Sequence, residues 1–402
     1  MNKRGGSVLA LATVAVAALA STAGAGTAAT STTAATQAIN CKQTLKLALV
    51  TPLTGGAGFI GTAQQRWVKY AVKTLPQKYG LKIQLLNGDT PVEQGAAPAQ
   101  ALAQKYVADQ KVVAIIGPAT SGAVAATSKT YFDAGVAHIS PSATRTSLTK
   151  TANREGTSAF FRVVADDGIQ GPFDAKFMVD KLKVKKVVLV DFQEPYSVGL
   201  ADSTQGALKK AGVTTIRESA SIKATDYSSL VTKVPSDTDI VFFATQQPED
   251  AQTFARQLAE QGKKAKVFGG DGSNSPEKFK VPGAYSSNFA APIDLFAYNK
   301  PIIDGWKKDN PGQSLEAFGP PAYGAVQVAL EAIKKACDAG KGQLTERRDV
   351  IRQVKKVRIS NWLLGGTFRW STKTNDPLNG QFYIFEIQSN GSYKLVSGAA
   401  GT

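Results

Sequence analysis

The chain has 402 residues, of which 43% are hydrophobic and 8% aromatic, and this ordinary globular composition excludes a low-complexity or fibrous protein. The length exceeds what one hydrophobic core usually serves, so we expect two domains. The net charge is +16, but the basic residues are dispersed and no aromatic-interleaved basic stripe is present. We therefore interpret the lysines as solvated surface and expect no nucleic-acid partner.

The N-terminus has the order of a secretory signal peptide. A basic leader with Lys3 and Arg4 precedes the apolar run Ser7–Ala20, and a segment rich in Ala, Thr, Ser and Gly follows. The apolar run is short for a bilayer span, so export is favoured over a membrane anchor or a disordered tail. We predict a signal peptide over about residues 1–29, a linker over 30–43, and a location in the periplasm or outside the cell envelope.

The two cysteines, Cys41 and Cys337, lie far apart, and no CxxC pair or Cys/His cluster accompanies them. A metal site is therefore not expected. In an oxidising compartment one pair indicates one disulfide, while two buried free thiols remain the alternative.

Strands and helices alternate through the first part of the chain after residue 44. The predicted strands are Leu45–Val50, Leu81–Leu86, Val112–Ile116 and Val136–Ile139. The predicted helices are Gln64–Leu75, Ala96–Ala108 and Gly122–Phe132. This run of βα units predicts a parallel sheet covered on both faces.

The alternation begins again after Phe160. The predicted strands are Lys186–Asp191, Val213–Ser219, Ile240–Ala244 and Lys266–Phe268. The predicted helices are Gly171–Leu182, Val198–Ala211, Tyr227–Val234 and Glu249–Gln261. The chain is therefore predicted to fold as two doubly wound α/β lobes, with a boundary near residues 163–168.

The C-terminal part has a different pattern. Tyr323–Ala339 is a strongly amphipathic helix, with its alanines and valines on one face. Gly365–Trp370 and Gln381–Gln388 alternate as antiparallel strands do, and Asn-Gly turns follow.

One motif suggests a nucleotide. The segment Gly56–Gly61 reads GxGxxG after a strand, and Asp89 could stand where a ribose-binding acid would. However, Pro52-Leu53-Thr54 separates the glycines from the strand and spoils the tight turn that the motif needs. We favour a glycine loop lining a ligand cleft, and a nicotinamide-dependent oxidoreductase is the less favoured alternative.

Catalytic constellations are weaker still. His138 is the single histidine and lies in an apolar strand pattern, so a packed strand histidine is expected. No GxSxG elbow is present. The pair Asp166/Asp167 is interpreted as a helix N-cap. We expect neither an enzyme nor a cofactor.

Thr120-Ser121 follows a strand and begins a helix, so its backbone N–H groups and hydroxyl suit a ligand carboxylate. Ser142 and Thr144 follow the next strand, at the same sheet edge, where open α/β sheets bind ligands. A purely capping role for these hydroxyls is the alternative.

Five segments together carry a family resemblance, which spans about Leu45 to Val396. The chain resembles the leucine/isoleucine/valine-type binding proteins of branched-chain amino-acid ABC transporters, which have the type I periplasmic binding protein fold. The segments are LALVTPLTGGAGFIG at 47–61, IIGPATSGAVAAT at 115–127, VAHISPSATRTSLT at 136–149, RVVADDGIQGP at 162–172 and VVLVDFQEPYSVGLA at 187–201.

The resemblance implies two Rossmann-like lobes joined by a three-strand hinge. Lobe 1 would comprise residues 44–163 and 292–364, and lobe 2 would comprise residues 164–291 and 365–398. It also implies a role for the two cysteines, because the helix that ends near Cys337 packs on lobe 1 in this family. A bridge from Cys41 to Cys337 would then pin the start of lobe 1 to that helix.

The resemblance also implies a head-group site for an α-amino acid. The carboxylate and the ammonium of the ligand would both be bound by lobe 1, through Ser121, Ser142 and Thr144. Tyr196 would close over the ligand from lobe 2, and Asp271 would pair with the ammonium. An unpaired buried ammonium would be costly, so an acid is needed there.

The positions that select the side chain depart from the family pattern. Asp271 stands where these binders carry Glu, amides at Gln246 and Gln247 replace an aromatic residue, and Phe59-Ile60 replaces a bulkier aromatic wall. The expected ligand is therefore an amino acid or an analogue. It would be captured by hinge closure and passed by a monomeric protein to an ABC permease, with a ligand-sensing receptor module as the alternative.

Overall fold

The computed structural model describes residues 38–150 and 155–398. The predicted signal peptide lies outside these residues. Helices in the described part of the chain are α1 Gly58–Thr74, α2 Ala97–Ala108, α3 Ser121–Asp133, α4 Asp167–Asp180, α5 Pro195–Lys210, α6 Ser228–Thr232, α7 Pro248–Glu260, α8 Lys300–Asp309, α9 Gly319–Ala339 and α10 Arg348–Val354. No helix among them is both long and apolar enough to cross a membrane.

The first large sheet is parallel, with the strand order β3-β2-β4-β5-β6. Its strands are β2 Thr44–Thr51, β3 Lys82–Asp89, β4 Val112–Ile116, β5 Ala137–Ser140 and β6 Phe160–Arg162. Counted along the chain this is the order 2-1-3-4-5, one of the two common orders of doubly wound folds.

The second large sheet repeats the same order in β8-β7-β9-β10-β11 and adds two antiparallel strands beside β11. Its strands are β7 Lys186–Asp191, β8 Thr214–Ser219, β9 Ile240–Phe243, β10 Lys266–Gly269, β11 Tyr285–Asn288, β13 Tyr383–Ile387 and β14 Tyr393–Ser397. The predicted fold class, two doubly wound α/β units, is therefore confirmed.

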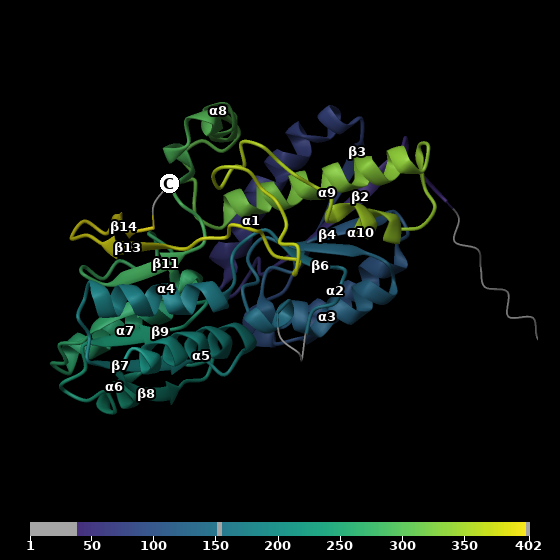
Figure 1. The fold of residues 1–402 in the computed structure, drawn as a ribbon. Helices are drawn as coiled ribbons and strands as arrows, with labels where there is room; N and C mark the ends of the chain where they lie inside the picture. Colours follow the sequence, from purple (N-terminus) through teal and green to yellow (C-terminus); the bar gives the residue numbers. More distant parts are fainter. Residues whose placement is uncertain (1–37, 151–154, 399–402) are drawn as a thin grey trace, which may run out of the picture. The chain divides into compact units, whose positions relative to one another are not determined.

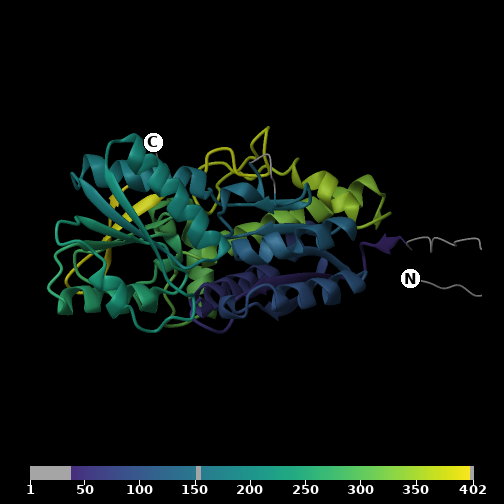
Figure 2. The ribbon, with the colours of Figure 1, turned by 90° about the horizontal axis from the view of Figure 1, so that it is seen from below.

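Helices cover both faces of each sheet (Figures 1 and 2). Alternate residues of a strand point to opposite faces, and apolar side chains on both faces pack against these helices. In β2, Leu47 and Leu49 pack with the core that includes α1 and α9, whereas Ala48 and Val50 pack with α2 and α3. In the second sheet, α4 and α5 cover one face while α6 and α7 cover the other. Strands buried on both faces read as continuous apolar runs, which is the pattern of the sequence.

The α9 helix lies beside α1 in the first core (Figure 1). Trp67 of α1 is fully buried, stacks on Trp306 of α8 at 4.9 Å between ring centroids, and meets Tyr323 of α9 edge-on. The amphipathic helix predicted over 323–339 is thus present and extends four residues further toward its N-terminus.

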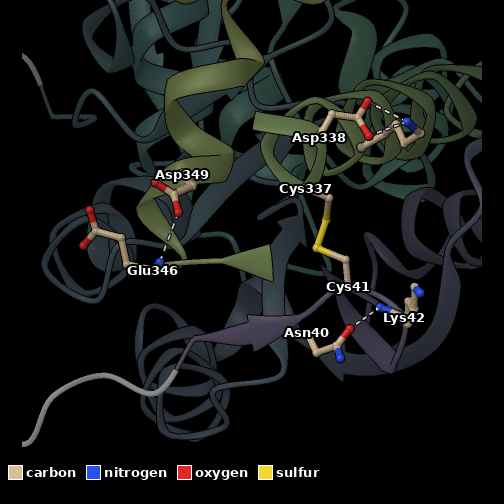
Figure 3. The surroundings of a disulfide bond; sticks show 8 residues. Asn40, Cys41, Lys42, Cys337, Asp338, Glu346 and Asp349 are labelled. Atoms are coloured by element: carbon tan, nitrogen blue, oxygen red, sulfur yellow. Dashed lines mark hydrogen bonds and ion pairs between the residues drawn. A yellow bond between two sulfur atoms is a disulfide. The ribbon is translucent and has the colours of Figure 1, made fainter. Parts of the chain in front are cut away.

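A disulfide joins Cys41 to Cys337 (Figure 3). Cys41 directly follows β1 (Ile39–Asn40), which pairs antiparallel with β12 (Gln343–Leu344) just beyond α9. The bridge and the small sheet together fasten the beginning of the described chain to the end of α9.

One predicted strand is wrong. Gly365–Trp370 forms no strand; Phe368 makes an isolated bridge with Ile359, and Trp370 makes one with Pro377. Phe368 and Trp370 are nevertheless both buried in the first core. Alternate burial therefore produced the period-2 pattern in a segment that lacks a continuous neighbouring strand.

Candidate functional site

Loops from both large sheets meet where the parallel strands end. Open α/β sheets bind ligands at this edge, beside the strand at which the order reverses. Here the loops enclose a cavity of about 10 Å³, roughly the room that one water molecule needs. It is lined by Ile60, Ala119, Thr120, Ser121, Ser142, Tyr196, Gln246, Asp271, Gly272 and Phe318. Five of the predicted site residues therefore face one space: Ile60, Ser121, Ser142, Tyr196 and Asp271.

The α3 helix contributes its N-terminus to this cavity. Thr120 is the N-cap residue, with an extended backbone, and its own side chain makes no capping hydrogen bond to the first N–H groups. The hydroxyl of Ser121 accepts a hydrogen bond from the Arg145 backbone N–H at 3.2 Å. Uncapped N–H groups at the positive end of a helix dipole suit a carboxylate.

The Ser142 hydroxyl is already engaged within the protein. It donates to the Ala119 carbonyl at 2.7 Å and accepts from Gln64 Nε2 at 2.8 Å. Gln64 in turn accepts from the Thr51 hydroxyl at 2.7 Å. The side chain of Ser142 thus ties the loop after β5 to the loop after β4, which leaves a ligand role to its main chain.

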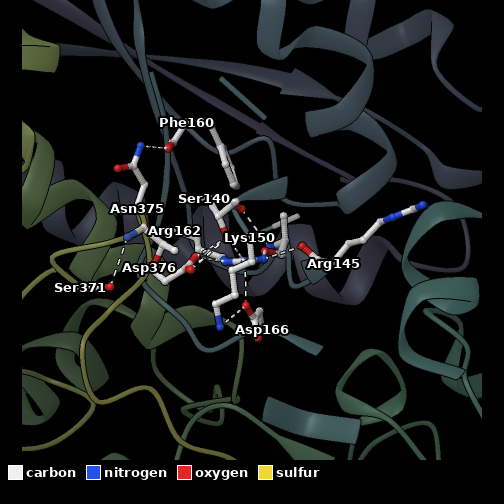
Figure 4. A network of polar contacts seen from close by, with 12 residues as sticks. Ser140, Arg145, Lys150, Phe160, Arg162, Asp166, Ser371, Asn375 and Asp376 are labelled. Atoms are coloured by element: carbon white, nitrogen blue, oxygen red, sulfur yellow. Dashed lines mark hydrogen bonds and ion pairs between the residues drawn. The ribbon is translucent and has the colours of Figure 1, made fainter. Parts of the chain in front are cut away.

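Thr144 lies on the same loop and is completely buried, and its hydroxyl has no hydrogen bond of good geometry among the described residues. Arg162, also completely buried, holds the main chain on both sides of it (Figure 4). Its guanidinium donates to the carbonyls of Ala143 at 3.2 Å and Arg145 at 2.9 Å. Arg162 therefore fixes where Thr144 lies.

Arg162 is itself held by two carboxylates, one four residues further along the chain and one more than two hundred residues away. Its Nε donates to Asp376 at 2.6 Å and its Nη2 to Asp166 at 3.1 Å. Asp166 also pairs with Lys150 at 2.6 Å. Asp166 does occupy the N-cap position of α4, as predicted, but its side chain makes no capping bond, and both cations contact its Oδ2 atom.

The opposite side of the cavity carries Tyr196 and Asp271. The Tyr196 hydroxyl donates to Asp271 Oδ1 at 2.8 Å and accepts from the Gly272 N–H at 2.9 Å. Glu194 places Tyr196 at the start of α5 by accepting two backbone N–H groups there, at 2.8 and 2.9 Å. A Cβ at Gly270 would lie 2.5 Å from Leu200 Cδ2 and 2.8 Å from the Tyr196 hydroxyl oxygen, so a glycine there lets both side chains approach the main chain.

Three carboxyl groups are buried on this side. Burial raises the pKa of Asp271 to about 6, against hydrogen bonds from Tyr196 and Gln170 that lower it. Burial and the nearby Asp271 also raise the pKa of Asp167 well above its usual range, and burial does the same for Asp174. Clustered buried carboxylates repel one another, and a cation among them would relieve this.

Asp167 is the functional candidate that the sequence did not reveal. Neither of its carboxylate oxygens has a hydrogen bond of good geometry among the described residues, although the Thr144 hydroxyl lies near enough to lower its pKa. Its backbone N–H donates to the Thr144 carbonyl at 2.9 Å. The Thr144 hydroxyl and the Asp167 carboxylate are thus neighbours at the junction of the two sides.

The residues predicted to select the ligand side chain lie in different surroundings in the structure. Ile60 lines the small cavity, whereas Phe59 lines a second cavity next to it. Gln247 donates through its side chain to the Ile222 carbonyl at 2.8 Å, and Gln246 lines the small cavity instead. Phe318, which no sequence motif marked, completes that lining.

The nucleotide-like motif has a packing explanation. Gly58 and Gly61 lie inside α1 rather than in a loop, and a Cβ at Gly61 would lie 1.8 Å from the Pro52 carbonyl oxygen. Asp89 accepts from the backbone N–H groups of Leu53 at 2.6 Å and Thr54 at 3.2 Å, so it orders the loop after β2. These contacts leave the oxidoreductase alternative without structural support.

His138 is a packed strand residue, as predicted. It is fully buried in β5, its Nε2 lies 3.0 Å from the Ser128 hydroxyl, and burial lowers its pKa to about 3. Among the described residues no group of three His, Cys, Asp or Glu side chains could hold a metal ion. The polar groups around the cavity thus include hydroxyls, the backbone N–H groups that begin α3, and the Asp271 carboxyl.

Comparison with known proteins agrees with this geometry. The family model for periplasmic binding proteins matches residues 44–392, which is most of the chain. The chain belongs to the periplasmic binding protein family.

Relatives of this periplasmic binding protein include two curated proteins and a solved structure. A leucine-, isoleucine-, valine-, threonine- and alanine-binding protein of Pseudomonas aeruginosa is 27% identical over 310 residues, which are 75% of this chain and 81% of that protein. Leu/Ile/Val-binding protein homolog 1 of Brucella abortus is 29% identical over 357 residues, 86% of this chain and 91% of its own. The crystal structure of a leucine-binding protein from Thermotoga maritima aligns with a TM-score of 0.77 at 22% identity, covering 88% of this chain and 98% of that one.

Proposed function

We propose that this periplasmic binding protein is exported, captures an α-amino acid between two lobes, and delivers it to a membrane ABC permease. One observation carries the proposal. The uncapped N-terminus of α3 and the buried Asp271–Tyr196 pair face each other across the same small cavity. An α-amino acid is the zwitterion whose carboxylate and ammonium would satisfy both ends.

The ligand would enter by separation of the two lobes, because a cavity of about 10 Å³ holds no amino acid. We propose lobe 1 as residues 44–163 plus 292–370, and lobe 2 as residues 164–291 plus 371–398, with the last boundary moved from residue 364 because Phe368 and Trp370 pack in the first core. The hinge would be the three crossings near Val163–Asp167, near Ala290–Pro292 and between Trp370 and β13. The closed form of a monomer would then be the one that the permease recognises.

The relatives support this proposal through their names, which describe amino-acid-binding proteins. Membership of a periplasmic binding family supports a location outside the cytoplasm. The groups that would hold the head group line the small cavity, although Asp271 replaces the Glu of the family and amides at Gln246 and Gln247 replace an aromatic residue.

Isothermal titration calorimetry of the purified protein tests the proposal. We expect binding of small α-amino acids such as alanine and leucine. We expect none of leucinamide, which lacks the carboxylate, or of 4-methyl-2-oxopentanoate, which lacks the ammonium. NAD serves as a control for the nucleotide alternative. Binding of NAD without binding of any amino acid would refute the proposal.

Small-angle scattering tests the closure separately. The radius of gyration should fall when a saturating amino acid closes the lobes. Identical profiles with and without a ligand that calorimetry shows to be bound would refute hinge closure while leaving the binding role intact.

A further inference from the structure

A second cavity, of about 390 Å³, adjoins the small one. Phe318 lines both, and Phe59 of the larger cavity is the neighbour in sequence of Ile60 in the smaller one. The larger cavity draws its remaining lining from the residues around Pro276, Pro292 and Leu315, and from strands β13 and β14. It therefore lies where segments of both proposed lobes and the second proposed hinge crossing converge.

The two cavities differ in chemistry. Much of the larger one is apolar, with Phe59, Ala63, Ile293 and Phe385 among its lining residues. Carboxylates also line it, at Glu277, Asp294 and Glu316, whereas none of the described residues that form its wall is a Lys or Arg. Glu316 is paired with Arg66 at 2.5 Å. Such a wall accepts an uncharged apolar group and disfavours an anionic one.

The Phe318 side chain is shared by the two spaces, since it lines both. The Phe318 ring meets Phe59 edge-to-face at 5.5 Å and Phe289 edge-to-face at 5.4 Å between centroids. Its neighbour Ala317 is half-buried and lines the larger cavity. A change in the Phe318 rotamer as the lobes move would open a passage from the head-group site into the larger cavity.

We infer, resting on the proposed function, that the larger cavity receives the side chain of the bound amino acid. Its size then defines the ligand class, since a cavity of about 150 Å³ already holds benzene. The ligand is an α-amino acid with an uncharged apolar side chain larger than that of leucine. The polar head stays between α3 and Asp271, and the side chain passes Phe318.

A homologous series of straight-chain α-amino acids tests this inference by calorimetry. The series runs from alanine through norvaline and norleucine to 2-aminooctanoic acid. Burial of each methylene should raise the affinity about fourfold, and the rise should continue past norleucine. An affinity that peaks at norleucine and then falls would overturn the inference.

Two tryptophan variants locate the side chain. Ala317→Trp should fill the larger cavity and reduce the ratio of 2-aminooctanoate affinity to alanine affinity at least tenfold. Ala126→Trp, at a half-buried alanine of α3 outside the cavity, should leave that ratio unchanged. A ratio that survives in Ala317→Trp would place the side chain elsewhere and overturn the inference.

The two proposals fail in distinguishable ways. If no member of the series binds, the proposed amino-acid function is refuted, and this inference with it. If alanine and leucine bind while longer chains do not, only the inference fails. The wild-type series decides this even if a tryptophan variant does not fold.

Discussion

The two sides of the small cavity differ in the charge of the groups that they bury. The side formed by the first sheet offers neutral groups, namely the N–H groups that begin α3 and the hydroxyls of Ser121 and Thr144. The side formed by the second sheet and α4 buries the carboxyl groups of Asp167, Asp174 and Asp271. A helix N-terminus without a bound anion costs the unliganded protein little free energy, whereas clustered buried carboxylates destabilise it until a cation binds. The ligand ammonium should therefore matter more to affinity than its carboxylate.

The largest expected effect comes from Asp271→Ala. Removing the carboxylate would leave the buried ammonium without its ionic partner, so amino-acid affinity should fall at least hundredfold, consistent with the roughly 3–5 kcal/mol cost of breaking a buried pair. The melting temperature should stay near that of the wild type, since the free protein loses a strained buried charge. Calorimetry and thermal unfolding measure the two quantities.

Asp250→Ala is the matched control for this substitution. Asp250 is a largely buried carboxyl group in α7 whose pKa burial raises to about 7, and it does not line the cavity. Its loss should change affinity less than threefold. Equal losses in the two variants would show that the negative field of the second side is diffuse rather than focused on Asp271.

Acid should weaken binding next most strongly. Burial raises the pKa of Asp271 to about 6, and the neighbouring Asp167 and Asp174 carboxyls shift in the same direction. An ammonium needs the ionised form, so affinity should fall about tenfold per pH unit below pH 6. Calorimetry from pH 8 to pH 4.5 measures how steeply the affinity depends on pH. Asp271→Asn should lower the affinity and make it less dependent on pH.

The Asp271 carboxyl should also affect the free energy of unfolding, and here high pH should be unfavourable, whereas for ligand affinity it is favourable. The folded pKa of Asp271 lies above that of an unfolded Asp, near 3.9, so folding takes up a proton between these values. The destabilising contribution of Asp271 is therefore fully present above about pH 6 and disappears as the pH falls toward 3.9. Asp271→Asn should raise the free energy of unfolding more at pH 8 than at pH 4.5, and no difference between the two would contradict a strained carboxylate.

Most of the fold was predictable from the sequence, because strands buried on both faces leave long apolar runs and helices between them leave amphipathic ones. The strand over Gly365–Trp370 was wrong because period 2 reports alternate burial and not a neighbouring strand. Phe368 and Trp370 alternate into the first core, while the Trp370 Nε1 donates to the Val354 carbonyl at 2.6 Å.

The site was predictable where one loop follows one strand, and not where distant segments meet. Ser121 and Asp271 each sit just beyond a strand and could be placed at the sheet edge. The bond of Arg162 to Asp376 joins residues more than two hundred positions apart, and no periodicity encodes it. Asp167 resembled a helix cap because acids are common there, and only its burial and unpaired oxygens distinguish it.

The smallest expected effect comes from the neutral side, in Thr144→Val. The buried Thr144 hydroxyl has no hydrogen bond of good geometry within the described part of the chain, so its loss should leave stability unchanged or raise it by about 1 kcal/mol. Affinity should fall about tenfold, because the ligand would lose one hydrogen bond to the charged head group. Thr127→Val is the control, since the Thr127 hydroxyl, unlike that of Thr144, already donates to a main-chain carbonyl, that of Ala123, at 2.7 Å. A Thr144→Val variant that keeps full affinity would leave recognition on the neutral side to the main chain alone, and the contrast between the two sides would then be sharper than we propose.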